Sequence, residues 1–476
     1  MGISALCLFA SQGLSVSAAT IKEEKIARNQ ALAIQSNEVA NWPTGPVVSA
    51  ESAILMDADT GAILYAKNIH QQEYPASTTK ILTTLIASER CSMDEIVDFS
   101  YDAVHDIDPG SNHIAIDPGE QLTMEECLNA ILIRSANEVS FAVAEHISGT
   151  TWQDFAPIMN ERAKELGCVD SNFVNPNGLP NEDHYTSAYD LAMIGRAFFA
   201  NEALCKMTMT HMLHILPSER QPDDIMEVNK MELIPGGKYA YPYLVGCKTG
   251  YTDVARSTLV SCAEKDGMKL ICVVMKDENP NYYEDTITLF DYGFSNFQRV
   301  NISQTETKYN IENVGSFYSG NDIFGNSKPI LELNQTDSIT LPNTITFQDA
   351  VSSISYDNTE PGQVAVITYT YNDVVLGTAS LDFTAAEKGS SVFRENTAET
   401  TESAEESGAT DETQSGTTTT EADNTETTET AGDNTGNNGG IPTVAQETSP
   451  EEENSTSGGP AVIFINVVKV FFCIVG

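Results

Sequence analysis

Apolar and polar positions follow different periodicities in different parts of the chain, and these changes outline its organisation. Between residues 48 and 299, short apolar runs typical of strands separate segments with helical spacing. Residues 52–67 and 257–275 each predict a hairpin of two apolar strands. Helical spacing covers three segments, 78–88, 124–147 and 151–166. The pattern predicts an α/β domain, a sheet flanked by helices, over residues 48–299.

Helical spacing disappears after residue 300. Residues 364–371 and 374–383 form two apolar runs on either side of Asn372-Asp373, which predicts a β-hairpin. We therefore expect a small all-β, sandwich-like domain over residues 300–386. Residues 387–460 are dominated by Thr, Glu, Ser, Asn and Gly, so they carry too little apolar surface to offset the entropy of ordering and predict a disordered acidic linker.

Both ends of the chain are apolar. Residues 1–19 end in Val-Ser-Ala-Ala and predict a signal peptide, although no Lys or Arg precedes Lys22 and the recorded start is expected to be truncated. Residues 20–47 lead into the α/β domain. Residues 461–476 fall short of the roughly 20 residues of a spanning helix and predict a membrane anchor cut off at its C-terminus, with an interfacial helix as the alternative. The chain is thus expected to be exported, to the outer face of the cytoplasmic membrane or the cell wall.

Charge and composition exclude several classes of function. The formal net charge is -43, with 68 acidic residues against 25 basic ones, which argues against nucleic acid as a partner. The nine cysteines contain no CxxC pair, and the seven histidines show no metal-ligand spacing. We expect neither a metal nor a cofactor.

Candidate chemistry begins at the predicted helix that follows Tyr74-Pro75. Ser77 and Lys80 are three residues apart, so a helix places them on one face, where the amine can reach the hydroxyl. A lysine can take the serine proton only if its pKa is lowered by burial or by nearby positive charge. Alone, this pair is a weak signal, because a capped helix with a surface lysine has the same sequence.

Two further motifs complete the set. Ser135 and Asn137 are two residues apart, so a hydroxyl and an amide can point together into a cleft from a loop. Lys248, Thr249 and Gly250 lie on a predicted strand and offer a cation, a hydroxyl and close backbone approach, which suit a terminal carboxylate. Each motif alone is usually structural. Together they form the signature of penicillin-binding proteins and class A β-lactamases.

The chain resembles the D-alanyl-D-alanine carboxypeptidases of the low-molecular-weight penicillin-binding protein group over most of residues 48–300. Beyond the three motifs, the resemblance rests on residues 50–61, on residues 173–179 (Phe-Val-Asn-Pro-Asn-Gly-Leu) with 184–191 after them, and on 245–252. It implies a β-lactamase/transpeptidase-like catalytic domain and a β-rich domain after it. Peptidoglycan stem peptides and β-lactam antibiotics are the implied partners, with membrane attachment through the C-terminal segment.

The resemblance also implies a role for each site residue. Ser77 would be acylated, with Lys80 as base, Ser135 as proton shuttle and Asn137 as positioner of substrate and of Lys80. Lys248 and Thr249 would hold the terminal carboxylate beside Gly250, and the backbone amides of Ser77 and Tyr251 would form the oxyanion hole. Glu138 stands where the family commonly has Asp, and Arg256 where Gly is usual. Residues 221–243 fit poorly and leave the cleft wall and any auxiliary carboxylate-binding arginine unassigned.

Three alternatives remain open at this point. A class A β-lactamase needs a separate glutamate that drives water onto the acyl-enzyme, and no equivalent loop is evident. A zinc-dependent peptidase needs a histidine and aspartate ligand set, for which the histidines lack the spacing. An inactive wall-binding protein would have no need of the intact motifs.

Overall fold

The computed structural model describes residues 18–309, 331–357 and 362–383, together with Glu360. Apart from Ala18 and Ala19, the predicted signal peptide lies outside these residues, and so do the predicted linker (387–460) and membrane segment (461–476). Within the described part, no helix has both the length and the apolar character needed to cross a bilayer.

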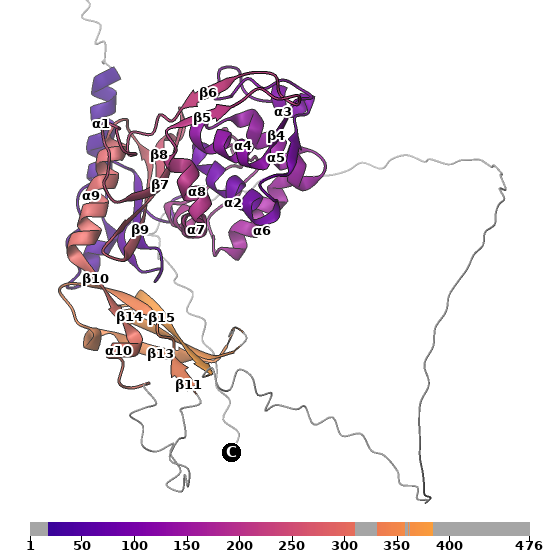
Figure 1. Cartoon of the computed structure of the whole chain (residues 1–476). Helices are drawn as coiled ribbons and strands as arrows, with labels where there is room; N and C mark the ends of the chain where they lie inside the picture. Colours follow the sequence, from indigo (N-terminus) through magenta and orange to yellow (C-terminus); the bar gives the residue numbers. More distant parts are fainter. Residues whose placement is uncertain (1–17, 310–330, 358–359, 361, 384–476) are drawn as a thin grey trace, which may run out of the picture. The chain divides into compact units, whose positions relative to one another are not determined.

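A five-stranded antiparallel sheet in the order β2-β1-β9-β8-β7 forms the centre of the α/β part (Figure 1). Its strands are β1 (Ser52–Asp57), β2 (Ile63–Lys67), β7 (Leu244–Thr252), β8 (Arg256–Lys265) and β9 (Met268–Asp277). The two hairpins predicted from the sequence, β1–β2 and β8–β9, are both present. Within the described part of the chain, β7 is an edge strand whose one strand partner is β8, so its other edge can meet a peptide.

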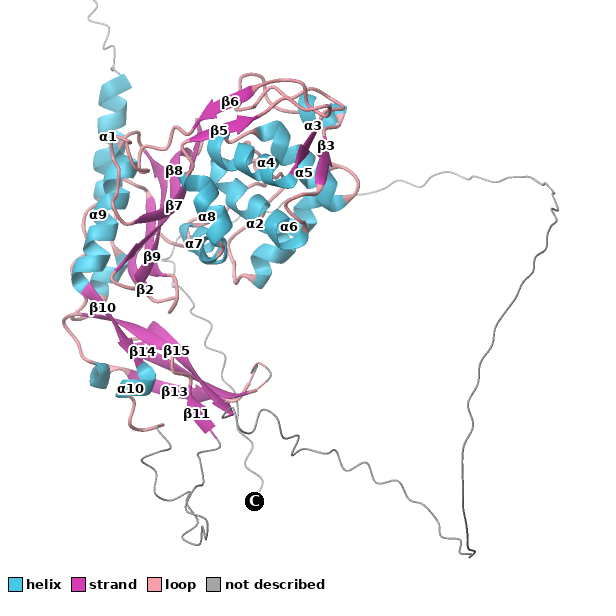
Figure 2. Ribbon diagram, in the orientation of Figure 1, coloured by secondary structure: helices cyan, strands magenta, loops and turns pink. Residues whose placement is uncertain are grey.

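Both faces of the sheet are covered, as Figure 2 shows. Successive side chains of a strand point to opposite faces, so Ile54 and Met56 of β1 join one buried cluster while Ala53 and Leu55 join the other. Helix α9 (Asn281–Asn296) packs on the second face. The remaining helices are α1 (Ala18–Gln30), α2 (Lys80–Arg90), α3 (Tyr101–His105), α4 (Met124–Asn129), α5 (Asn137–Ser148), α6 (Phe155–Glu165), α7 (Ala188–Ala200), α8 (Glu202–Met209) and α10 (Ile302–Thr305). Apart from α1 and α10, these helices all contribute side chains to the first cluster.

The single helix predicted over residues 124–147 is wrong, because the structure divides it. α4 passes into a π-helical turn at Ala130–Arg134, and the next residue, Ser135, has a φ of 62°. The chain then restarts as α5 at Asn137. The extra residue of a π turn and a left-handed residue both end regular α geometry. The break places Ser135 in the short link between the π turn and α5, whereas Asn137, which we also expected on a loop, is the first residue of α5.

Two small hairpins extend the α/β part, and strands dominate the described residues after it. The hairpins are β3 (Ile96–Asp98) with β4 (Gln121–Thr123), and β5 (Met212–Ile215) with β6 (Ile225–Val228). The later strands are β10 (Phe297–Asn301), β11 (Leu331–Leu333), β12 (Ser338–Pro342), β13 (Val351–Ser355), β14 (Gln363–Tyr371) and β15 (Val374–Phe383).

The β14–β15 hairpin confirms its prediction. Its turn residues, Asn372 and Asp373, have φ values of 45° and 65°, the positive pair that a tight two-residue hairpin turn requires. All described residues fall within one compact unit, so the domain boundary near residue 300 stays a prediction.

Candidate active site

Ser77 lies in a tight turn at the start of α2. The 3-10 turn Ala76–Thr79 continues directly into the helix. The side chain of Lys80 therefore folds back over the turn, and its Nζ lies 3.2 Å from Ser77 Oγ. Ala76, just before the serine, has a φ of 50°. Such a left-handed residue costs about 1–3 kcal/mol and is found preferentially at functional sites.

The amine of Lys80 is fully buried. Its Nζ lies 2.7 Å from Asn137 Oδ1 and 2.6 Å from the main-chain oxygen of Asn177. Burial, and then the positive charge of Lys248, hold the pKa of Lys80 well below its usual value. A neutral amine has two N–H groups and one lone pair. Because the two short contacts use both N–H groups, the lone pair remains for the hydroxyl proton of Ser77.

A second buried amine, Lys248 of β7, lies on the other side of the site. Its Nζ donates to Ser135 Oγ at 3.1 Å and to the main-chain oxygen of Thr249 at 2.9 Å. Burial lowers the pKa of Lys248 to about 8, so most of it is protonated at pH 7. We expected Ser135 to exchange a proton with Lys80. Among hydrogen bonds of the described residues, Ser135 Oγ contacts Lys248, and none joins it to Lys80.

Gly250 lets β7 approach the turn that carries the nucleophile. A Cβ added at Gly250 would lie 2.8 Å from the backbone nitrogen of Ser77 and 2.5 Å from Thr258 Oγ1. No side chain can occupy that space without a shift of the backbone. The Thr258 hydroxyl donates to the main-chain oxygen of Pro75, which ties β8 to the same turn. The close approach brings the backbone of Ser77 next to that of β7.

These residues open onto a cavity of about 410 Å³. Its lining comprises Ser77, Gly110, Ser111, Asn112, Ser135, Asn137, Gly178, Leu179, Lys248, Thr249, Gly250, Tyr251, Thr252, Ser257, Asn279 and Tyr282. The structure thus brings all the predicted site residues to one place, with Lys80 buried beneath the lining. Among the described residues of the lining, Lys248 alone is charged, so the cavity favours an anionic group. A larger cavity of about 560 Å³ near Trp42 and Met193 is mostly apolar and contains none of the predicted site residues.

Sequence reasoning missed the loop that holds Lys80 from the far side. The main-chain oxygen of Asn177 accepts from Lys80, and Thr83 Oγ1 donates to that of Pro176. At Gly178 the φ is 84°, and an added Cβ would lie 1.8 Å from the main-chain oxygen of Ala76. Only glycine fits there. A Pro-x-Gly turn was visible in the sequence, but a main-chain carbonyl leaves no residue-type signal.

A buried histidine fixes this loop against the nucleophile's helix. His184 Nδ1 accepts from the Val174 amide at 3.1 Å, so its Nε2 carries the proton and donates to Thr79 Oγ1 at 2.9 Å. Burial, and then the charge of Lys80, lower the pKa of His184 to about 3. The imidazole is therefore neutral in the folded protein at physiological pH.

This neutral histidine predicts a loss of stability in acid. Unfolded His184 takes up a proton near pH 6.5, while the folded form does so only near pH 3. The contribution of His184 to the free energy of unfolding is complete above pH 6.5. It falls by about 1.4 kcal/mol per pH unit as the pH drops toward 3. Urea unfolding at several pH values measures the slope. His184→Gln removes the titrating group and should reduce the slope of the free energy of unfolding against pH. Equal slopes in the variant and the wild type would contradict the role of His184 in acid stability.

Two departures from the family pattern now have structural explanations. Arg256 stands where glycine is usual and has a φ of 54°, the left-handed conformation that glycine adopts freely. Its guanidinium forms a bidentate ion pair with Glu278 at 3.0 and 2.7 Å.

The second departure, Glu138, is buried, and its Oε1 accepts from the Ile114 amide at 2.6 Å. Burial raises the pKa of Glu138. It anchors the loop that carries the cavity residue Asn112.

The stretch 221–243, which fitted the family poorly, contributes no described residue to the cavity lining, but it contains β6 of the hairpin β5–β6. Arg134 forms an ion pair with Glu227 of β6 at 3.1 Å and donates to Asn112 Oδ1 at 2.6 Å. It therefore links this hairpin to the cavity rim. The cavity lining itself contains no arginine. Lys248 is thus the cation that the described lining offers to a carboxylate.

Comparison with known sequences identifies a family. A sequence profile described as D-alanyl-D-alanine carboxypeptidase (Peptidase S11) matches residues 39–279, slightly more than half of the chain. D-alanyl-D-alanine carboxypeptidase DacF of Bacillus subtilis is 37% identical over 252 residues, which cover 52% of this chain and 63% of that protein. D-alanyl-D-alanine carboxypeptidase DacB2 of Mycobacterium tuberculosis is 32% identical over 263 residues, which cover 53% of this chain and 84% of that protein.

Solved structures show the same fold. Penicillin binding protein 5 from Haemophilus influenzae has a TM-score of 0.55 at 23% identity, over 72% of this chain and 98% of that one. Penicillin binding protein 6B from Escherichia coli has a TM-score of 0.52 at 25% identity, over the same shares of the two chains. The profile match contains every predicted site residue, from Ser77 to Tyr251.

Proposed function

Because this chain belongs to the D-alanyl-D-alanine carboxypeptidase family, we propose that it removes the terminal D-alanine from peptidoglycan stem peptides through an acyl-enzyme on Ser77. One observation carries the proposal. The buried amine of Lys80 lies 3.2 Å from Ser77 Oγ, beneath a cavity in whose described lining Lys248 is the charged residue. A nucleophile with its base and a cation for a carboxylate are what this hydrolysis requires.

Acylation uses both amines. Lys248 and the hydroxyl of Thr249 bind the carboxylate of the terminal D-alanine. Ser77 Oγ attacks the carbonyl carbon of the penultimate D-alanine as its proton passes to Lys80 Nζ. The C–N bond then breaks, and that proton returns to the leaving amine; to act as the shuttle, Ser135 would turn its hydroxyl from Lys248 toward Lys80. Asn137 holds Lys80 and the substrate amide.

The oxyanion formed in this step needs donors. We assign this role to the backbone amides of Ser77 and Tyr251, because the Ser77 nitrogen lies against Gly250, the residue before Tyr251. Loss of one such donor typically costs about 3–4 kcal/mol of transition-state stabilisation. Water then attacks the acyl-enzyme with Lys80 as base, the ester bond to Ser77 Oγ breaks, and the shortened peptide leaves.

β-Lactams would acylate the same serine. A class A β-lactamase uses a glutamate to drive water onto the acyl-enzyme, but the described cavity lining contains no carboxylate. The buried Glu138 uses its Oε1 on the Ile114 amide instead. We therefore expect the penicillin adduct to persist, which favours a carboxypeptidase over a β-lactamase.

The substrate class also bears on location. Stem peptides lie outside the cytoplasmic membrane, and the N-terminal 19 residues have the apolar, small-residue pattern of a signal peptide. We infer export to the outer face of the cytoplasmic membrane or to the cell wall. The apolar residues 461–476 are proposed to attach the chain to the membrane.

Mass spectrometry of the purified chain after incubation with penicillin tests the proposal. We expect one adduct per chain, on the peptide containing Ser77, with a lifetime much longer than one catalytic turnover of peptide. The same preparation should release D-alanine from a peptide ending in D-Ala-D-Ala. Rapid penicillin turnover would identify a β-lactamase, and a chain without either reaction would be a wall-binding protein.

The two lysines also predict how activity depends on pH. Because the pKa of Lys248 is lowered to about 8, kcat/KM for the peptide should fall above about pH 8 as the carboxylate loses its cation. A pH profile of D-alanine release measures this fall. Lys248→Arg keeps the charge and should move the alkaline fall to higher pH, even if its plateau is lower. An unmoved alkaline limb would show that another group titrates.

A further inference from the structure

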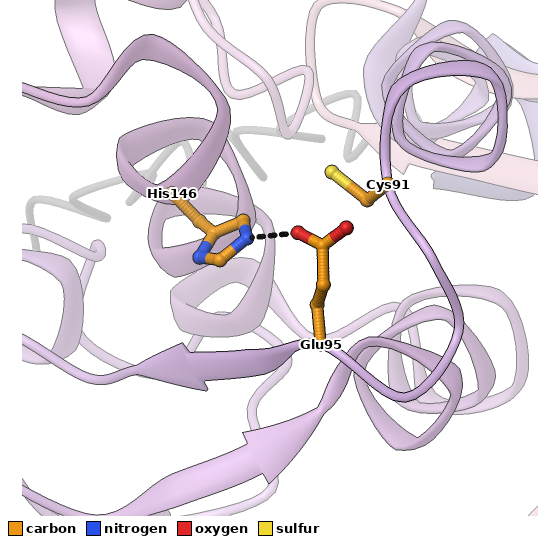
Figure 3. Close-up of side chains that lie close together, drawn as sticks. All are labelled: Cys91, Glu95 and His146. Carbon is orange, nitrogen blue, oxygen red and sulfur yellow. Dashed lines mark hydrogen bonds and ion pairs between the residues drawn. The ribbon is translucent and has the colours of Figure 1, made fainter. Parts of the chain in front are cut away.

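Three side chains of types that bind metals lie close together, two of them at the ends of helices that begin at the active site and one in a nearby loop. α2 begins at Lys80 and is followed by Cys91, while α5 begins at Asn137 and carries His146 in its last turn. Glu95 lies in the loop before β3. Figure 3 shows the three side chains pointing toward one another. Their sulfur, oxygen and nitrogen atoms all lie within 4.8 Å of one another.

The backbone of this cluster is held in place before any ligand binds. The amide of Cys91 closes the last turn of α2, and that of Ser92 donates to Glu95 Oε1 at 2.7 Å. The main-chain oxygen of Glu95 accepts from Met124, the first residue of α4. The second carboxylate oxygen of Glu95 lies 2.9 Å from His146 Nε2. The three donors are therefore aimed at a common point from fixed elements.

The cluster has the donors of a metal site and access for an ion. The side chains of His146 and Glu95 are 25% and 41% exposed, and Cys91 is half-buried. Burial, and then the charge of Glu95, raise the pKa of the Cys91 thiol. A divalent cation would reverse this effect by stabilising the thiolate. None of the three residues lines the cavity around Ser77.

We propose that Cys91, Glu95 and His146 bind a zinc ion, with water as the fourth ligand. Zinc takes thiolate, imidazole and carboxylate donors in tetrahedral sites, whereas calcium and magnesium require oxygen donors. Zinc–ligand bonds of about 2.0–2.3 Å place neighbouring donors roughly 3.5 Å apart, so small side-chain rotations suffice. On binding, the thiol proton leaves to solvent and His146 carries its remaining proton on Nδ1.

The ion would join the C-terminal ends of the helices whose first residues are Lys80 and Asn137. It is thus a structural clamp rather than a participant in the reaction. Spacing along the sequence predicted no metal site, because Cys91 and His146 are 55 positions apart in the numbering. Folding alone brings them together. The proposal does not depend on the function assigned to Ser77.

Metal titration of the untagged, reduced, chelator-treated chain tests this site. Cobalt chloride should bind one ion per chain and produce the near-ultraviolet thiolate-to-cobalt absorption of a tetrahedral site, and zinc chloride should displace it. Zinc at 100 times its Kd should raise the Tm by about 3–5 °C. Wild-type protein that shows no 1:1 binding at micromolar metal would overturn the proposal.

Matched variants locate the ion. Cys91→Ser should abolish the thiolate absorption and weaken zinc binding at least 100-fold, and His146→Gln should weaken it similarly. Cys168→Ser removes another half-buried thiol, one outside the cluster, and should bind as wild type. A wild-type far-ultraviolet circular dichroism spectrum confirms that each variant is folded. Equal cobalt affinity and spectra for Cys91→Ser and wild type would refute the assignment.

Discussion

Replacing Ser77 with alanine is expected to abolish both D-alanine release and penicillin labelling. The hydroxyl oxygen of Ser77 forms the acyl bond, and among the described residues Lys80 makes a hydrogen bond to no other nucleophile. Removing the nucleophile of a serine hydrolase lowers kcat by about 10⁴-fold or more. Folding should be little affected, because alanine keeps the backbone of the turn. Steady-state D-alanine release and intact-protein mass spectrometry with penicillin measure the two losses.

A second serine, Ser88, serves as a control that distinguishes loss of the nucleophile from a change in packing. Ser88 lies on α2 as a half-buried serine whose Oγ donates to the main-chain oxygen of Leu85, and it does not line the cavity. Ser88→Ala should therefore keep both activities near the wild-type level. A penicillin adduct that survives in Ser77→Ala would mean that another residue is the nucleophile, and the assignment of this cavity would fail.

Local patterns in the sequence were enough to predict the hairpins. β1–β2 and β14–β15 each consist of apolar strands joined by a short turn, and the turn residues Asn372 and Asp373 tolerate the positive φ that the turn requires. The chemistry-bearing motifs were also visible, because Ser77 and Lys80 are neighbours on one helical turn. These features depend on residues close together in the chain.

The helix break at Ser135 could not be predicted in the same way. Apolar residues continue with helical spacing on both sides of it, so the periodicity favoured one long helix. What distinguishes Ser135 in the structure is its contact with Lys248, 113 residues away. The strained φ is compatible with the fold because that contact and the restart of α5 at Asn137 hold it. Neither cause is present in the local sequence.

Two other features depended on contacts that residue types do not specify. The oxygen that Asn177 offers to Lys80 belongs to the main chain, so any residue could supply it. Cys91, Glu95 and His146 come from three elements, and no spacing rule groups them. The sequence thus predicted the residues that converge on the cavity, but not the second support of Lys80 or the cluster at the far ends of the helices.

The fold gives the two buried lysines of the site different tasks. Lys248 contacts a hydroxyl and one carbonyl and keeps a pKa of about 8, which suits a cation that binds carboxylate. Lys80 contacts two acceptors, Asn137 Oδ1 and the main-chain oxygen of Asn177, and burial, followed by the charge of Lys248, holds its pKa well below the usual value. Two amines of equal pKa could not divide the roles of base and anchor at one pH.

Replacing Lys80 with methionine is therefore expected to slow acylation of Ser77 by about 10²–10⁴-fold, the usual contribution of a general base. Methionine is unbranched and of similar length, so it fills the same buried space without an amine. The acidic limb of the pH profile, which reports deprotonation of Lys80, should vanish, while the alkaline limb set by Lys248 should remain. Stopped-flow labelling with a fluorescent penicillin across pH measures the second-order rate constant.

Lys67 provides the matched control, because it too is a buried lysine on the same fold. Its Nζ donates to the main-chain oxygens of Asn29, Val48 and Ala50 at 2.8, 2.9 and 2.7 Å. Lys67→Met leaves these acceptors unpaired and should lower the Tm, yet the folded fraction should acylate at the wild-type rate. If both variants lost acylation only in proportion to their loss of folded protein, Lys80 would be a structural lysine. A fall in rate confined to Lys80→Met, with its acidic limb gone, requires a base at that position.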